Sequence, residues 1–62
     1  MLPLAAMPTV FVKPGRVYIA VSEEDLDLVE EGWEPVARFK NAAIAFRAAR
    51  WYADRFEYVL EW

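Results

Sequence analysis

The side chains in this sequence that could take part in chemistry are almost all carboxylates and basic groups. The 62 residues include ten Asp and Glu and seven Lys and Arg, but no His and no Cys. The chain therefore lacks the usual general base at neutral pH, the usual thiol nucleophile and the usual zinc ligands. Its one serine, Ser22, occupies an expected helix cap and has no base beside it. We expect a protein that is not an enzyme and that uses no cofactor.

Paired carboxylates suggest a cation site. Glu23 and Asp27 are spaced i, i+4, so a helix would bring both to one face. A regular helix does not wrap a cation as a calcium loop does, and the acid spacing of such a loop is absent. We therefore expect no metal site and interpret these acids as a solvated face.

Charge is separated along the chain. Residues 22–34 hold seven acids and no base, whereas residues 38–55 hold five bases and one acid. The simplest expectation is that the two blocks attract each other or face water, where ion pairs contribute little.

The acidic block suggests a first interaction surface on a helix expected over residues 23–31. Helical spacing predicts that Leu26 and Val29 anchor this helix to a sheet, and that Leu28 is exposed beside the acids. An exposed leucine among carboxylates suits a partner with a basic surface, because opposite charge speeds encounter. The expected acidic face consists of Glu23, Glu24, Asp27, Leu28, Glu30 and Glu31.

The basic block suggests a second surface, on a helix expected over residues 42–55. A helical wheel places Trp51 on the outward side between Arg47 and Arg55, with Ile44 two turns earlier. The outward face of an amphipathic helix normally carries polar residues, so an exposed tryptophan at this position needs an explanation. The expected aromatic and basic face consists of Ile44, Arg47, Arg50, Trp51 and Arg55.

Three explanations for Trp51 stay open. The apolar start of the chain could cover it. It could form a protein interface, where Trp and Arg are enriched, either with a foreign protein or in a homo-oligomer. It could also stack on the bases of a single-stranded nucleic acid, with arginines on the phosphates. We rank nucleic acid below a protein partner because the acidic block repels a polyanion at short range.

The elements that position these surfaces follow from local signals. Residues 9–12 and 17–21 are rich in β-branched and aromatic side chains, and the Pro14-Gly15 turn between them predicts a β-hairpin. The helix that follows should start at Ser22 and end at Gly32 in the left-handed conformation.

The second half of the chain predicts a third strand, a second helix and a fourth strand. Residues 33–39 contain Pro35, which restricts this strand to an edge or places the proline at its start. Asn41 should cap the helix, and residues 58–62 form the last strand. The expected fold is an α+β two-layer sandwich of order ββαβαβ, with three or four strands and both helices on one face.

We expect one domain over residues 9–62, preceded by a loose leader over residues 1–8. Met7 is an alternative start. The leader lacks the basic region of a signal peptide, and no apolar run is long enough to span a membrane, so we expect a cytoplasmic protein. Ten aromatic residues are more than so small a core hides, and some should be exposed.

In this general character the chain is similar to many small proteins of phages and mobile elements. That resemblance implies a protein that occupies a surface on a larger host machine. The main hypothesis is a non-catalytic binding protein that inhibits or regulates a larger host protein through surface contact. The alternatives are a nucleic-acid-binding regulator that uses the basic helix, and a homodimer or larger homo-oligomer.

Overall fold

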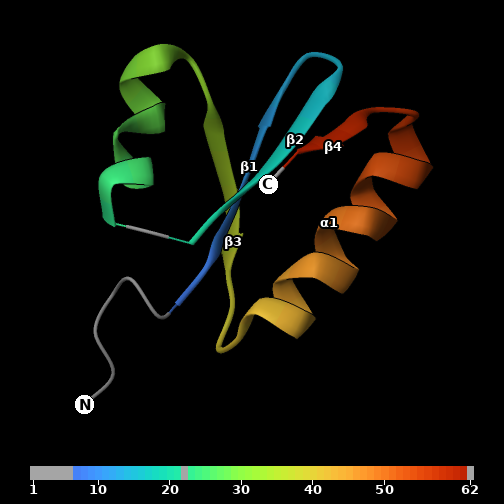
Figure 1. Ribbon diagram of the computed structural model, residues 1–62. Coiled ribbons are helices and arrows are strands. Elements are labelled where there is room, and N and C mark those ends of the chain that lie inside the picture. The colour runs from blue at the N-terminus through green and yellow to red at the C-terminus, as the bar shows by residue number, and fades with distance from the viewer. Residues whose placement is uncertain (1–6, 22, 62) are drawn as a thin grey trace.

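The computed structural model describes residues 7–21 and 23–61, and for residues 23–26 it describes the backbone alone (Figure 1). The elements follow in the order β1 (Thr9–Lys13), β2 (Arg16–Ala20), the 3₁₀-helix η2 (Glu23–Glu31), β3 (Glu34–Arg38), α1 (Ala42–Phe56) and β4 (Val59–Glu61). The four strands form one sheet with the order β3-β1-β2-β4. The α+β class predicted from the sequence is confirmed.

The predicted hairpin forms the centre of the sheet. β1 and β2 pair antiparallel, and Lys13 lies opposite Arg16 across the turn. Gly15 has a φ of 83°, the left-handed backbone that only glycine adopts without strain. The proline and glycine of the turn therefore fix the register of the two central strands.

The third and fourth strands lie at opposite edges of the sheet and do not pair with each other. β3 runs antiparallel to β1, with a register shift between Val10 and Phe11. Pro35 lies on this edge strand, as predicted, because a residue without an N–H cannot complete a central ladder. β4 runs parallel to β2, and the Val59 N–H donates to the Gly15 carbonyl at 2.9 Å.

The first helix differs from its prediction. Residues 23–31 form a 3₁₀-helix, so the described chain contains one α-helix and the expected order ββαβαβ with two α-helices is wrong. Its end is as predicted, since Gly32 has a φ of 95° and its N–H donates to the Val29 carbonyl at 3.1 Å. The Trp33 N–H donates to the Leu28 carbonyl at 3.0 Å, which completes a Schellman-type cap. The predicted cap at Ser22 lies outside the described residues.

The second helix begins and ends at defined caps. The Asn41 side chain accepts a hydrogen bond from the Ile44 N–H at 2.9 Å, as the sequence predicts. At the other end, Glu57 adopts the left-handed conformation with a φ of 59°. The Tyr58 N–H then donates to the Ala53 carbonyl at 2.8 Å and turns the chain towards β4.

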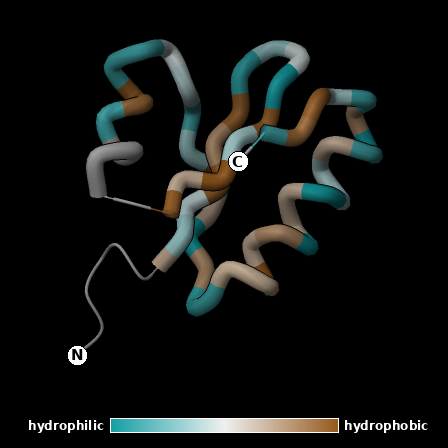
Figure 2. The backbone as a smooth tube through the Cα atoms, viewed as in Figure 1, coloured by the Kyte–Doolittle hydropathy of each residue, from teal (hydrophilic) through white to brown (hydrophobic). Residues whose placement is uncertain are grey.

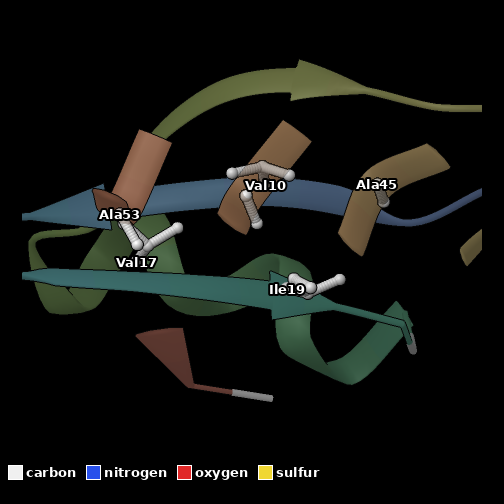
Figure 3. Packing of buried hydrophobic residues seen from close by; sticks show 6 residues of the cluster. Val10, Val17, Ile19, Ala45 and Ala53 are labelled. Carbon is white, nitrogen blue, oxygen red and sulfur yellow. The ribbon is translucent and has the colours of Figure 1, made fainter. Parts of the chain in front are cut away.

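Two separate apolar clusters cover the two faces of the sheet. Between the sheet and α1, the buried side chains of the helix are all alanines, and the half-buried Tyr52 packs against them (Figure 3). This cluster consists of Val10, Val17, Ile19, Ala45, Ala49 and Ala53. On the other face, Phe11, Ala20 and Trp33 pack together, and Tyr18 and Leu28 contact them.

The layers are therefore η2, sheet and α1, and the expectation of both helices on one face is wrong (Figure 1). The physical reason is that successive strand residues point to opposite faces, and in β1 and β2 each set includes buried apolar residues. The apolar residues on each face of the sheet must therefore be shielded from water by a helix packed against them. No helix in the described ranges is long and apolar enough to cross a membrane.

Candidate interaction surfaces

The face of α1 that points away from the sheet holds the most exposed aromatic side chain among the described residues. Ala45, Ala49 and Ala53 face the sheet and are buried. Trp51 lies on the opposite side of the helix and is 63 % exposed. A large apolar ring in water is unfavourable by an amount that scales with its exposed area, so this position marks a candidate contact surface.

The neighbours of Trp51 on the helix surface are the residues that the sequence predicts. Arg47 and Arg55 lie one turn before and after it, and both are exposed. Ile44, two turns before it, is 44 % exposed. We call this line the Trp51 stripe: Ile44, Arg47, Trp51 and Arg55. The structure brings these four together, and their role in binding stays a prediction.

Arg50, the fifth predicted residue of this face, lies beside the stripe and is already paired. Its Nε lies 3.3 Å from the Asp54 carboxylate one turn later on α1. Arg55 also has a contact, since its guanidinium carbon lies 5.8 Å from the centre of the Phe56 ring. Among the described residues no carboxylate pairs with Arg47 or Arg55, so both charges are available to a partner. The hypothesis that the leader over residues 1–8 covers Trp51 depends mostly on residues 1–6, which lie outside the described residues.

The acidic surface is arranged differently from its prediction. Leu28 is half-buried and packs against the cluster of Phe11, Ala20 and Trp33, so its expected place beside the acids is wrong. Val29, the expected anchor, is 55 % exposed. The contact of Leu28 with this buried cluster, which helical spacing does not predict, decides which of the two residues faces water.

The described acids of η2 are exposed. Asp27, Glu30 and Glu31 all face water, whereas the side chains of Glu23 and Glu24 lie outside the described residues. Figure 2 shows hydrophilic segments along η2 and along α1 on opposite sides of the sheet. The two oppositely charged helices are thus separated by the sheet, so they do not attract each other through direct contact. Among the described side chains, no three acids lie close enough together to hold a metal ion.

A cluster at the hairpin turn was not predicted from the sequence. Trp33 is only 6 % exposed. The Lys13 ammonium lies 5.0 Å and the Arg16 guanidinium carbon 4.9 Å from its ring centre. The hairpin register, which pairs Lys13 with Arg16, is the signal that could have placed these cations together, but nothing local places Trp33 beneath them.

Arg16 also anchors the last strand. Its Nε and a terminal nitrogen donate to the two oxygens of Glu61 at 2.5 and 2.8 Å. These hydrogen bonds hold the pKa of the Glu61 carboxyl below its ordinary value and raise the pKa of Arg16. The pair is exposed, so it fixes the geometry of the edge more than it stabilises the fold.

An open cavity of about 220 Å³ lies between the hairpin turn, the start of β3 and the end of α1. Its lining residues are Val12, Lys13, Pro14, Gly32, Glu34, Tyr52 and Tyr58. The phenols and the Glu34 carboxylate offer hydrogen bonds, but the Lys13 ammonium is held over Trp33. This lining pairs no nucleophile with a general base.

Compared with known proteins, the chain matches no family model, and neither a curated protein nor a solved structure matches it.

Proposed function

We propose that this protein is a non-catalytic binding protein that inhibits or regulates a larger protein through surface contact, with the Trp51 stripe as its docking face. One observation carries the proposal: Trp51 is 63 % exposed on the side of α1 that faces away from the core. Trp and Arg are the side chains most enriched among residues that dominate binding energy.

The charge of the stripe indicates the kind of surface that it fits. Arg47 and Arg55 flank Trp51 and are unpaired by any described carboxylate. A partner that offers an apolar depression bordered by acidic side chains would bury the indole and pair both guanidinium groups. The prediction that the acidic surface of η2 contacts a basic region of a host protein remains, with Val29 in the place of Leu28.

A protein partner is favoured over nucleic acid. Arg50 is paired with Asp54, which leaves two arginines on this face without a described carboxylate partner, and the whole chain carries a net charge of −3. Phosphate binding depends steeply on the number of cations that contact it. The nucleic-acid function is therefore an outcome that the experiment must distinguish.

The test is photo-crosslinking in the cells that express the protein. Benzoylphenylalanine replaces Trp51 in one variant and Val59 in the control, because Val59 is also exposed and apolar, at 64 %, but lies on β4. We expect a discrete adduct with a larger protein from position 51 alone. Excess wild-type protein should suppress it, whereas the variant with Arg47→Glu and Arg55→Glu should not.

Two results would overturn the proposal. Equal adducts from positions 51 and 59 would mean that the stripe is not special. An adduct that nuclease treatment removes would mean that the stripe binds nucleic acid. For a purified partner, Trp51→Ala should weaken binding by about tenfold or more.

A further inference from the structure

The two exposed helical surfaces lie on opposite faces of the sheet and have opposite charge. From this arrangement we propose that a second copy of this chain docks its η2 surface on the Trp51 stripe, so that copies associate head to tail. The inference rests on the proposed function only in using the same stripe, which self-association would occupy when no foreign partner is bound.

The η2 surface carries the negative charge and the exposed apolar side chain that this contact needs. In a 3₁₀-helix, side chains three residues apart eclipse each other, so Asp27 and Glu30 lie on one line. Val29 borders that line and is 55 % exposed. We call these three residues the η2 patch. Leu28 holds the patch on the sheet through its contact with the cluster of buried aromatic residues.

The Trp51 stripe and the η2 patch complement each other. The stripe has an apolar centre, Trp51, with cations one turn to either side, and the patch has Val29 bordered by two carboxylates. Among the described residues, the ion pairs are Arg16–Glu61 and Arg50–Asp54, so none of the charges on these two surfaces is already neutralised. Contact between copies would pair the charges and bury both apolar side chains.

A symmetric dimer through α1 is disfavoured by the same charges. A two-fold axis at Trp51 would bring two antiparallel helices together and place Arg47 of each copy opposite Arg55 of the other. Like charges in direct opposition destabilise a contact. Stripe-to-patch contact is instead heterologous: each copy keeps one free stripe or patch, so association continues beyond two copies unless it closes into a ring.

Sedimentation equilibrium with two single-surface variants tests the proposal. The stripe variant carries Arg47→Gln and Trp51→Gln, and the patch variant carries Val29→Ser and Glu30→Gln. All four positions are exposed, so both variants should keep the fold, which circular dichroism checks. A control variant with Glu57→Gln and Val59→Ser removes an exposed acid and an exposed valine elsewhere.

The expected results differ for each sample. The wild type and the control variant should exceed the mass of a dimer as concentration rises from micromolar to millimolar. Each single-surface variant should associate at least about tenfold more weakly. Their equimolar mixture should reach twice the chain mass and stop there, because each variant supplies one intact surface. High salt should weaken association in every sample.

Three outcomes would overturn the proposal: a wild type that stays monomeric, a mixture that forms no dimer, or a patch variant that forms a dimer as readily as the wild type. The last result would show a symmetric contact through α1. If the wild type stays monomeric but position 51 crosslinks to a foreign protein, head-to-tail association fails and the proposed function still stands. Conversely, crosslinking at position 51 that gives only an adduct of twice the chain mass would overturn the proposed function while supporting head-to-tail association.

Discussion

Glu57 carries a backbone conformation that its side chain does not favour. Its φ of 59° and ψ of 38° place it in the left-handed region, where a side chain costs about 1 kcal/mol relative to glycine. The conformation is needed because it lets the Tyr58 N–H reach the Ala53 carbonyl and directs Tyr58 onto the α1 side of the sheet. The strain at one residue thus makes the connection from α1 to β4 short.

Replacing Glu57 with glycine should therefore stabilise the protein. We expect Glu57→Gly to raise the free energy of unfolding by about 0.5–1 kcal/mol, because glycine adopts the same φ without strain. Ala43→Gly, within α1, should lower it by about 1 kcal/mol. Urea denaturation measures both. Equal destabilisation by the two changes would show that Glu57 is not strained.

Glu61 should titrate at lower pH than an ordinary glutamate, whose value is 4.5. Carbon NMR of the carboxyl group should show this depressed pKa, and Arg16→Gln should return it towards 4.5 because both hydrogen bonds disappear. Since the folded-state pKa is lowered, the pair stabilises the fold at pH values above the ordinary one. That contribution disappears as pH falls through the folded value. An unchanged pKa in Arg16→Gln would contradict the assignment.

At the scale of elements, α1 packs closely because its buried face is made of alanine. Ala45 and Ala49 are fully buried between α1 and the sheet, and Figure 3 shows Ala45 beside the strands that carry Val10 and Ile19. Such a surface has no spare volume, since protein interiors are packed as densely as organic crystals. Side chains larger than alanine at these positions must displace the helix.

Ala49→Leu should lower the free energy of unfolding by about 1–3 kcal/mol, because it overpacks this contact. Ala43→Leu makes the same chemical change at an exposed position of α1 and should change stability by no more than about 0.5 kcal/mol. Thermal unfolding of the two variants provides the comparison. Similar losses in both would mean that α1 is not tightly seated on the sheet.

Some elements could be predicted from the sequence because their signals are local. Pro14 and Gly15 determine the hairpin turn, and Asn41 determines where α1 begins. The type of the first helix could not be predicted, since its apolar residues Leu28 and Val29 fit an α-helix as well as a 3₁₀-helix. In the structure Leu28 contacts the cluster of Phe11, Ala20 and Trp33. That contact is non-local, and it decides which apolar residue of the acidic surface is exposed.

At the scale of the whole molecule, the order of strands explains why the two charged helices are separated. Because β3 and β4 lie at opposite edges, α1 must cross one face of the sheet. η2 follows the hairpin in the chain, and its Leu28 packs against the cluster of Phe11, Ala20 and Trp33 on the other face. The spacing of residues in the sequence predicts neither the strand order nor the placement of the two helices on opposite faces. Both depend on which face of the sheet each connection between strands crosses. The position of Trp51 on α1 needed only helical periodicity, so it was predictable.

This separation predicts that the two charged helices do not interact within one molecule. In dilute solution, Glu30→Gln and Arg47→Gln should change the free energy of unfolding additively, within about 0.5 kcal/mol. A double-mutant cycle by chemical denaturation measures the difference between the double variant and the sum of the single ones. Coupling that arises only as protein concentration rises would come from contact between copies, since association stabilises the folded state by mass action. Coupling above about 0.5 kcal/mol in dilute protein would instead place the two charges in direct contact across the molecule, which contradicts the layer order of η2, sheet and α1.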